Sequence, residues 1–537
     1  MQSKTFLRLA INSNNIKQQY FILSILMLIG VLLRLPSLRL GVWRDESSTY
    51  FNALPTDLHE VINTVIYSEL NPPGFYLIMH QWMQWFGAED VIFKLPAFIF
   101  GILLIPATYA LGSLIGVRTI GVIAAAVTTF APEAIYYSQE ARPYTLAALL
   151  CCFAVFLYCK AINNKKPKWY LLGFIICATT LLYVQYTGLI LLASLAIITL
   201  YLKWRGAANI RLIEFVIAYV IIFLLFTPWL QVFWTHLHTG LPWQTKEPWL
   251  MRPKLLYGNF KYTLPLIIGQ KVAAAITFLA LIVQTSQFFS GSQQFVHQWN
   301  FRLKTYTLIL NLSVLLTTIM MAALSYAGRY MFPFTPLAWV VYSSSVINLF
   351  QRIDDYWIGQ FNRIGKQIVV ILLVISIVFP NVKYAVSLGN TEKSGIKSLA
   401  ADVHKKYHKK TIYLINPDYL SPTFGYYFAD KSVNFYGVGR WNKPEIFSPQ
   451  DHVKVWDNPT LISDIEQRIQ NKIDNGYQKL VLVQEAGVRS DSGKMKYSLA
   501  NEVLPRLQQN YSLLEKTDYP GTNEPITVYE FALIKNK

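Results

Sequence analysis

The chain has 537 residues, of which 53% are hydrophobic and only 15% charged, and its formal net charge is +18. A soluble protein of this length could not hide so much apolar surface, because soluble domains carry about 25% charged residues. The positive charge does not favour a nucleic-acid partner, since much of the Lys and Arg lies in short loops between apolar runs. Basic residues placed in this way orient a chain in a membrane and contact anionic lipid headgroups.

Apolar runs long enough to cross a bilayer recur along the chain, since a hydrocarbon core of ~30 Å needs about 20 apolar residues per helix. Polar residues precede the first run as far as Gln19, and the run lacks a small-residue cleavage site. We therefore expect a signal anchor and not a cleaved signal peptide. The sequence predicts about eleven spans, at residues 20–38, 91–115, 119–137, 144–162, 169–185, 187–202, 212–234, 264–284, 306–327, 330–350 and 367–388.

The basic residues favour one side of these predicted spans. The segments on the side of the N-terminus are rich in Lys and Arg, and their few acids include Asp354 and Asp355. The basic residues on this side are Lys4, Arg8, Lys17, Arg118, Lys160, Lys165, Lys166, Lys168, Lys203, Arg205, Arg211, Arg302, Lys304, Arg352, Arg363 and Lys366. The positive-inside rule places this side, with the N-terminus, in the cytoplasm. An odd number of spans then places the C-terminal region outside the cytoplasm, and we expect a multi-pass membrane protein. The span pattern does not identify the membrane, and only the pattern of motifs in the outward loops favours the bacterial plasma (inner) membrane.

The first outward loop, residues 39–90, is long and partly apolar. Apolar residues at 58, 61, 62, 65 and 66 repeat at helical spacing and predict an amphipathic helix in the membrane interface. The apolar stretch 75–86 is too short to span a bilayer and predicts a second interfacial helix.

The character of the chain changes after residue 390. Runs rich in β-forming residues at 411–415, 479–484 and 526–534 alternate with amphipathic helical stretches at 396–407 and 461–473. This alternation predicts a small soluble α/β domain. The expected architecture is a polytopic α-helical membrane domain at residues 1–389, with amphipathic helices in its first outward loop, followed by a non-cytoplasmic α/β domain at residues 390–537.

Four polar clusters lie at the outward ends of the predicted spans. The first contains Asp45 and Glu46, a few residues beyond the first span. A carboxylate close to a membrane surface is costly and tends to be functional, and it could deprotonate an acceptor group. Adjacent residues point in different directions, so we expect the two acids to differ in role. A solvated loop acid, or an ion pair with Arg44, is the alternative interpretation.

The other clusters contribute further charges and rings. Residues 71–76 place two prolines before the short apolar run, which suits a rigid helix start, and the run contains His80. The turn after the third span holds Glu140, Arg142 and Tyr144, where a helix cap with a local ion pair is the alternative to a second acid beside an anion-binding arginine. In the turn before the tenth span, the Arg329-Tyr330 pair provides an arginine that could bind a lipid phosphate or extend to the headgroups.

All four clusters are predicted on one face of the membrane. Acids and arginines around a lipid-accessible site are suited to chemistry on a lipid-linked phosphate, because arginines stabilise the leaving phosphate and a carboxylate activates the acceptor.

Three strings in these clusters resemble the signature segments of bacterial GT-C fold glycosyltransferases of the family 39 type, which are relatives of protein O-mannosyltransferases and aminoarabinose transferases. They are GVWRDESSTY at 41–50, NPPGFYLIMHQWMQWFG at 71–87 and YYSQEARPYTLAAL at 136–149. Their order and spacing match, and the resemblance covers about residues 20–350. The family often has His before the double proline, whereas this chain has Asn71, so any role of that histidine is lost or altered here.

The resemblance implies inverting transfer of a sugar from a polyprenyl-phosphate donor to a glycan, lipid or protein acceptor on the non-cytoplasmic face. The family's catalytic acid falls on Asp45, with Glu46 in the same motif, and its later Glu and Arg fall on Glu140 and Arg142. The candidate catalytic residues are Asp45, Glu46 and Glu140, and the candidate substrate-binding residues are Arg142, Arg329, Tyr330, His80 and Tyr144. No cofactor or metal ligand is assigned, since metal dependence varies among such enzymes and His236-x-His238 alone is a weak metal signal.

Two other classes of protein fit part of the pattern. A transporter or flippase of lipid-linked sugars would also have many spans and phosphate-binding arginines, but transporters usually place their binding groups at the bilayer midplane. A non-catalytic scaffold that presents the C-terminal domain would tolerate substitution of the clustered acids and arginines. The sugar, the acceptor, the oligomeric state and the role of the C-terminal domain do not follow from the sequence.

Overall fold

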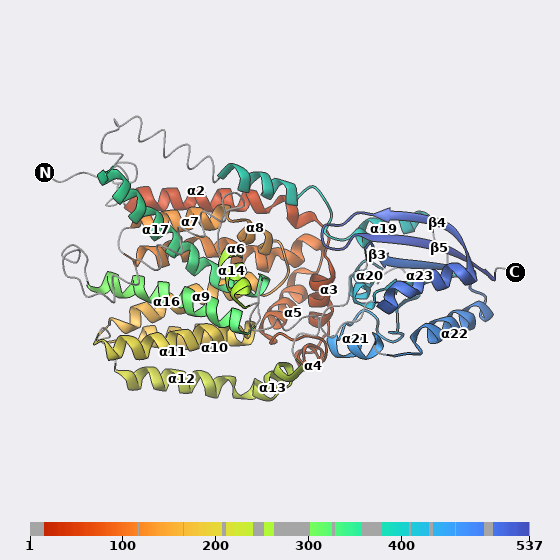
Figure 1. Cartoon of the computed structure of the whole chain (residues 1–537), viewed down its shortest axis with the longest axis horizontal. Coiled ribbons are helices and arrows are strands. Elements are labelled where there is room, and N and C mark those ends of the chain that lie inside the picture. The colour runs from red at the N-terminus through yellow and green to blue at the C-terminus, as the bar shows by residue number, and fades with distance from the viewer. Residues whose placement is uncertain are drawn as a thin grey trace. The chain divides into compact units, whose positions relative to one another are not determined.

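The computed structural model describes most of the chain, in twelve stretches (Figure 1). The described residues are 16–115, 118–164, 166–206, 211–239, 252–262, 301–324, 328–356, 378–406, 410–428, 433–456, 458–487 and 498–535.

These residues divide into two compact units. The helical unit comprises Met1–Pro36, Leu95–Trp229 and Glu247–Leu388, and the α/β unit comprises Ser37–Lys94, Leu230–Lys246 and Gly389–Lys537. The first outward loop therefore belongs to the same compact unit as the C-terminal region. The division into domains at residues 389 and 390 stays a prediction, since compactness alone does not establish independent folding.

The helical elements of the helical unit range from long helices to short helical turns (Figure 1). In chain order they are α2 (Ile16–Arg34), α6 (Asp90–Ser113), α7 (Arg118–Phe130), α8 (Pro132–Tyr137), α9 (Tyr144–Ile162), α10 (Lys168–Val184), α11 (Gly188–Trp204), α12 (Leu212–Phe226), η2 (Thr227–Trp229), α14 (Arg252–Tyr262), α16 (Phe301–Ala323), η5 (Gly328–Phe334) and α17 (Thr335–Tyr356), with the first turn of α6 in the α/β unit. Among the described residues, five helical segments have the length and hydropathy of a membrane span, at Ile16–Arg39, Asp90–Ser113, Tyr144–Ile162, Leu212–Thr239 and Thr305–Ala323. The chain is a multi-pass membrane protein.

Most of the predicted spans coincide with these helices, and two are wrong in detail. The span predicted at 119–137 is broken at Ala131, whose extended backbone (ψ 127°) separates α7 from α8 because Pro132 follows it. The span predicted at 330–350 begins as the 3-10 helix η5 and becomes α-helical at Thr335. The span at 264–284 lies outside the described residues, and only residues 378–388 of the last span are described, as helix.

The first outward loop folds into helices within the α/β unit. They are η1 (Pro36–Arg39), α3 (Arg44–Ala53), α4 (Leu58–Ser68) and α5 (Gly74–Phe86), and α13 (Leu230–Thr239) belongs to the same unit. The predicted helices at 58–66 and 75–86 are confirmed as α4 and α5. Val61 and Val65 of α4 are fully buried against Tyr76 of α5, so the two helices pack through their apolar faces.

The C-terminal part of the α/β unit is a five-stranded mixed sheet with the order β2-β1-β3-β5-β4 (Figure 1). Its elements are α19 (Gly395–Lys406), β1 (Thr411–Asn416), η7 (Asp418–Leu420), α20 (Ser421–Phe428), β2 (Phe435–Gly437), α21 (Pro449–Trp456), α22 (Leu461–Asp474), β3 (Lys479–Glu485), α23 (Ser498–Asn510), β4 (Tyr511–Tyr519) and β5 (Ile526–Lys535). Strands β2, β1 and β3 are parallel, and β5 is antiparallel to both β3 and β4.

Helices cover both faces of this sheet. On one face α19 and α20 pack against side chains of β1 and β3 that include Tyr413 and Val481. On the other face α21, α22 and α23 pack against the alternate side chains, which include Leu414 and Leu482. Alternation along each strand thus places an apolar layer on each face, which explains why these strands are apolar throughout. The predicted α/β fold of the C-terminal region is confirmed, although β2, β4, α20, α21 and α23 were not predicted.

Candidate active site

The segment that leads into α3 is held by hydrogen bonds to its backbone. Within the α/β unit, Gly41 N donates to Glu392 Oε2 (2.7 Å), Val42 N to Tyr427 Oη (2.7 Å) and Arg44 N to Glu524 Oε1 (2.8 Å). On the acceptor side, Lys94 Nζ donates to the carbonyl oxygens of Leu40 and Gly41, and Lys397 Nζ to that of Arg39. A side chain thus satisfies each of these backbone groups, which fixes the path of the segment.

The close approach at Gly41 explains why glycine stands there. A Cβ at this position would lie 2.6 Å from Lys397 Cδ and closer still to the hydroxyl of Tyr427. The residue that opens the GVWRDE string therefore has a packing reason to be glycine.

Helix α3 begins directly after this segment, with Trp43 in an extended conformation and the amides of Glu46 and Ser47 bonded to the Trp43 carbonyl oxygen, both at 2.9 Å. Asp45 and Glu46 lie in its first turn, where negative charge interacts favourably with the helix dipole. The first turn of α3 is therefore a favourable position for both carboxylates. Their different environments determine the chemical role of each.

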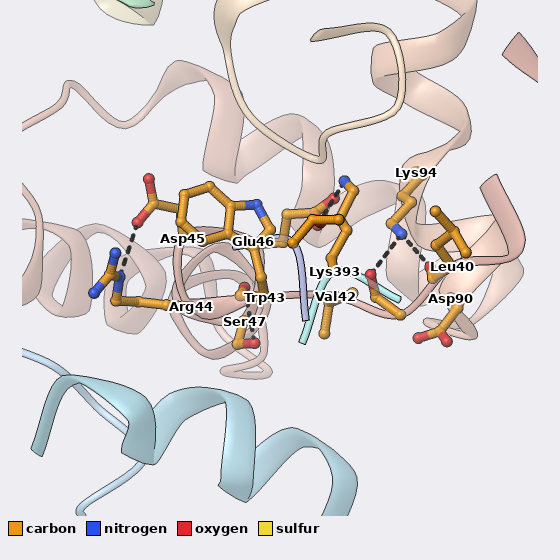
Figure 2. Close-up of polar contacts among 12 residues, drawn as sticks. Leu40, Val42, Trp43, Arg44, Asp45, Glu46, Ser47, Asp90, Lys94 and Lys393 are labelled. Carbon is orange, nitrogen blue, oxygen red and sulfur yellow. Dashed lines mark hydrogen bonds and ion pairs between the residues drawn. The ribbon is translucent and has the colours of Figure 1, made fainter. Parts of the chain in front are cut away.

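The two adjacent acids have different environments (Figure 2). The side chain of Glu46 is 0% exposed, and its Oε2 lies 3.0 Å from Nζ of Lys393, which is also buried. The side chain of Asp45 is 16% exposed, and its Oδ1 lies 3.7 Å from Nε of Arg44. Glu46 is thus neutralised inside the protein, whereas Asp45 keeps part of its surface accessible.

Arg44 lies over the ring of Tyr419, with its guanidinium carbon 4.5 Å from the ring centroid. Burial acts to lower the pKa of Arg44, but the charge of Asp45 and the carboxylates of Glu524 and Glu485 outweigh it and raise that pKa. Arg44 therefore stays cationic and provides Asp45 with a permanent positive neighbour.

Glu524 is the second acid of this region with an unusual environment. It is fully buried, and burial raises the pKa of its carboxyl group to about 7, although the charge of Arg44 and hydrogen bonds from Ser394, the Arg44 amide and Thr423 act in the opposite direction. Thr423 Oγ1 lies 3.4 Å from Glu524 Oε1 and 3.3 Å from Ser47 Oγ, so a short polar chain joins Glu524 to the first turn of α3.

In the helical unit, Glu140 and Arg142 lie in the buried turn between α8 and α9, 2% and 6% exposed. The Arg142 amide donates to the Glu140 carbonyl oxygen at 2.7 Å. The turn is tied to the end of α2, because Gln139 Nε2 donates to the Arg34 carbonyl oxygen (3.1 Å) and Arg34 Nε donates to Ser138 Oγ (3.1 Å). The side chains of Ser138 and Gln139 thus anchor the start of this turn to Arg34.

Arg34 also completes the end of α7. In a continuous helix the Thr128 carbonyl oxygen would accept from the amide of residue 132, but Pro132 has no N–H. Arg34 Nη2 donates to that oxygen at 3.0 Å, and Nη1 donates to the Thr129 carbonyl oxygen at 3.1 Å. A buried guanidinium thereby satisfies carbonyl groups that the proline break leaves open.

The remaining predicted residues of the helical unit gather around aromatic rings. Tyr144 begins α9, and its ring centroid lies 5.0 Å from that of Tyr137, which in turn lies 4.5 Å from that of Phe332. Phe332 belongs to η5, which also carries Arg329 with its guanidinium carbon 5.6 Å from the Tyr330 ring centroid. The 3-10 helix that carries Arg329 therefore packs against a residue of α8, one of the two helices that flank the turn with Arg142.

His80 lies in the α/β unit, on α5. It is buried, and its Nδ1 lies 3.0 Å from the carbonyl oxygen of Ala53, the last residue of α3. Asn71, which stands where the family often has His, donates to Glu69 Oε2 at 3.3 Å. The substrate-binding role of His80 stays a prediction.

Sequence analysis missed four residues that shape these sites, namely Arg34, Lys94, Lys393 and Glu524. Arg34 and Lys94 carried a signal, because an ionisable residue within an apolar run has to find a buried partner. Lys393 and Glu524 carried none, since each acts on a helix that lies more than 300 residues away in the sequence.

Comparisons with known proteins agree with this architecture. The model of the family described as dolichyl-phosphate-mannose-protein mannosyltransferase matches residues 71–232, well under half of the chain. No curated protein sequence matches the chain.

Several solved membrane proteins have a similar structure. The crystal structure of ArnT from Cupriavidus metallidurans in the apo state superposes with a TM-score of 0.55 at 12% sequence identity, covering 96% of this chain and 97% of that one. The same protein bound to undecaprenyl phosphate gives 0.51 at 12% identity, with 96% and 98% covered. The archaeal oligosaccharyltransferase AglB from Archaeoglobus fulgidus, in complex with an inhibitory peptide and a dolichol-phosphate, gives 0.54 at 12% identity, with 95% and 74% covered.

The chain shares the fold of these proteins. The predicted fold class, a GT-C-like helical membrane protein with a C-terminal α/β domain, is confirmed.

The role of Arg34 can be tested by removing its guanidinium. We expect Arg34→Met to lower the apparent melting temperature of the detergent-purified protein, because each buried carbonyl group left unpaired costs about 1–3 kcal/mol. Arg118→Met, an exposed position at the start of α7, is the matched control. Thermal unfolding followed by tryptophan fluorescence measures both variants, and equal melting temperatures for Arg34→Met and the wild type would contradict the assignment.

The raised pKa of Glu524 predicts a pH dependence of stability. Because the pKa in the folded state (about 7) exceeds the ordinary value of 4.5, the stability that this carboxyl group contributes is complete below about pH 4.5 and is lost as the pH rises to about 7. Glu524→Gln cannot ionise. Its apparent melting temperature, relative to that of the wild type, is therefore expected to rise by a few degrees between pH 5 and pH 8.

The measurement is thermal unfolding of both proteins at the two pH values. Glu502→Gln, an exposed position on α23, controls for the general effect of removing an acid. A difference between Glu524→Gln and wild type that is the same at pH 5 and pH 8 would show that Glu524 does not titrate in this range.

Proposed function

We propose that this chain is an inverting glycosyltransferase that transfers a sugar from a polyprenyl-phosphate donor to an acceptor on the non-cytoplasmic face of the membrane. The shared fold supports the proposal, as do the family match at residues 71–232 and the signature strings that resemble family 39. The ArnT structure with undecaprenyl phosphate and the AglB structure with dolichol-phosphate support a polyprenyl-phosphate donor.

The observation that carries the proposal is the different environment of the two adjacent acids. Glu46 is buried and paired with Lys393, so its carboxylate is committed to the protein interior. Asp45 is 16% exposed, and its Oδ1 lies 3.7 Å from Nε of Arg44. We assign Asp45 as the general base, and we assign Glu46 as an anchor instead of the catalytic role predicted from the sequence.

In the proposed reaction Asp45 takes the proton from the acceptor hydroxyl or amine. The acceptor atom forms a bond to the anomeric carbon of the sugar, from the side opposite the phosphate, and the bond between that carbon and the phosphate oxygen breaks. The oxygen leaves with the electron pair as polyprenyl phosphate, and the sugar inverts. Positioned proton transfer of this kind accelerates a reaction by ~10²–10⁴-fold.

The developing charge on the leaving phosphate needs cations. We assign Arg142 and Arg329 to this role, because a guanidinium matches the geometry of phosphate oxygens and binds them in pairs. Tyr144 and Tyr330 are assigned to the same substrate-binding region, and Glu140 is a second candidate acid. The sugar and the acceptor are left open.

The orientation is part of the proposal. The basic segments on the side of the N-terminus support a cytoplasmic N-terminus in the inner membrane, with the α/β domain on the other side.

The base assignment is tested by Asp45→Asn. We expect purified wild-type protein to release sugar from a radiolabelled polyprenyl-phosphate sugar, by slow hydrolysis or by transfer to an envelope extract. The Asp45→Asn variant should lose release by about 10²–10⁴-fold while keeping its melting temperature and its binding of lipid-linked sugar, since only the proton acceptor is removed.

The matched control is Asp57→Asn, which changes an exposed acid of the same loop. Near-normal release by Asp45→Asn would refute its role as the base. Binding of lipid-linked sugars without release by the wild type, for every donor tested, would instead favour a transporter or flippase.

The orientation is tested with a cysteine introduced at Lys454, whose side chain is 78% exposed in the α/β unit. A membrane-impermeant thiol reagent is expected to label Lys454→Cys in spheroplasts with an intact inner membrane, with unsubstituted protein as the blank. Labelling that appears only after the cells are lysed would place the domain in the cytoplasm.

A further inference from the structure

The C-terminal sheet has a topological switch point, the kind of place at which other α/β proteins bind ligands. The chain leaves β1 toward α20 on one face, and it leaves β3 toward α23 on the other face. Because β1 and β3 are parallel neighbours, their outgoing connections diverge at the carboxyl edge of the sheet. Open α/β sheets bind their ligands at such a switch point.

In this protein Arg44 lies at the switch point, where other α/β proteins bind a ligand. Tyr419 follows β1, Glu485 ends β3, and the Tyr419 hydroxyl donates to the Glu485 carboxylate. The guanidinium of Arg44, from the first turn of α3, lies over the Tyr419 ring at 4.5 Å, and the charge of the Glu485 carboxylate acts on it. The proposed catalytic helix thus occupies the place that a ligand takes in related sheets.

A second contact that fixes the first turn of α3 comes from Lys393. Its side chain forms the buried ion pair with Glu46 at 3.0 Å. Its backbone is fixed as well, because the amides of Asn523 and Glu524, in the turn between β4 and β5, donate to its carbonyl oxygen at 2.9 and 3.0 Å. The sheet therefore determines where the ammonium group that pairs with Glu46 lies.

Glu524 provides the third contact. Its carboxylate accepts a hydrogen bond from the Arg44 amide and another from Thr423, whose hydroxyl in turn is hydrogen-bonded to Ser47. Three side chains of the C-terminal domain, namely Lys393, Tyr419 and Glu524, thus contact the first turn of α3 from the sheet edge. None of them is placed in the chemistry itself.

We propose that the C-terminal α/β domain is a positioning device for the catalytic helix, in which Lys393, Tyr419 and Glu524 fix the first turn of α3 and thereby aim Asp45. The inference rests on the proposed function, in which Asp45 is the base. Successive residues of an α-helix point about 100° apart, so a Glu46 side chain held inward by Lys393 leaves Asp45 a single direction. A helix as short as α3 would not hold its place in isolation.

The ion pair can be removed without leaving a buried charge. In Glu46→Met/Lys393→Met both partners become apolar side chains of similar length, an exchange that is often neutral for stability. We expect this double variant and Lys393→Met to lower kcat for sugar release by about 10–100-fold, because a base displaced by about 1 Å can cost 10²-fold. KM for the lipid-linked donor should stay within twofold, since the donor phosphate is assigned to other residues.

A double-mutant cycle separates positioning from chemistry at Glu46. If the pair acts as one unit, the double variant loses no more kcat than Lys393→Met alone. A much larger loss in the double variant would mean that the Glu46 carboxylate reacts, and the inference would be overturned. Lys393→Arg, which keeps the charge, is expected to recover most of the turnover lost in Lys393→Met.

Lys454→Met is the matched control on the same domain, because the ion pair of this exposed lysine with Asp451 is solvated and weak. All variants are compared at equal amounts of monodisperse protein, with melting temperatures measured in parallel. Wild-type kcat in Lys393→Met and in the double variant overturns the inference, as does a raised KM at unchanged kcat.

Asp45→Asn is assayed beside them to distinguish failure of the positioning role from failure of the proposed function. Loss of release in Asp45→Asn together with normal kcat in the Lys393 variants overturns the positioning role and leaves the proposed function in place. Normal release in Asp45→Asn, or no release by the wild type, overturns the base assignment and the positioning role together.

Discussion

The buried ion pair between Lys393 and Glu46 is the interaction on which the α/β unit depends. It joins residues 347 positions apart, and both partners are almost completely shielded from water. Removing one partner of such a pair leaves an uncompensated buried charge at a cost of about 3–5 kcal/mol. The ion pair therefore joins the first outward loop and the C-terminal sheet into a single structural unit. If either part moved away alone, one buried charge would lose its partner.

In both units a buried cationic side chain donates hydrogen bonds to backbone carbonyl groups that have no helical partner. Where a chain turns near apolar surroundings, its backbone carbonyl groups lose their helical partners, and water is not available to replace them. In the helical unit Arg34 donates to the carbonyl groups of Thr128 and Thr129 that the Pro132 break leaves open. In the α/β unit Lys94 donates to those of Leu40 and Gly41. Each cation thereby stabilises the backbone beside a signature string. The backbone conformation at each string thus depends on a charged residue that is not part of the string.

The sequence predicted the parts that depend on local pattern. Apolar runs located most of the membrane helices, and runs rich in β-forming residues located β1, β3 and β5. The short β2 and the exposed edge strand β4, with Leu513 and Leu514 facing solvent, escaped because neither shows the alternation that a half-buried strand produces. Pro132 stood in the sequence, and its effect on the third span could have been predicted. The pairing of Glu46 with Lys393 could not, because composition and spacing carry no information about which distant lysine reaches a given acid.

The contacts of Arg44 and Tyr419 at the switch point of the sheet also bear on the role of the C-terminal domain. A sheet with β1 and β3 at a switch point invites the interpretation that the domain binds a small ligand of its own. Here Arg44 lies over Tyr419, and Tyr419 is bonded to Glu485, so the first turn of α3 already takes the position of such a ligand. A ligand entering there would have to displace a cation that lies over Tyr419 and forms an ion pair with Asp45. The domain is therefore better understood as the scaffold of the proposed catalytic loop than as a separate binding module. In the proposed function, groups other than those at this switch point recognise the sugar and the acceptor.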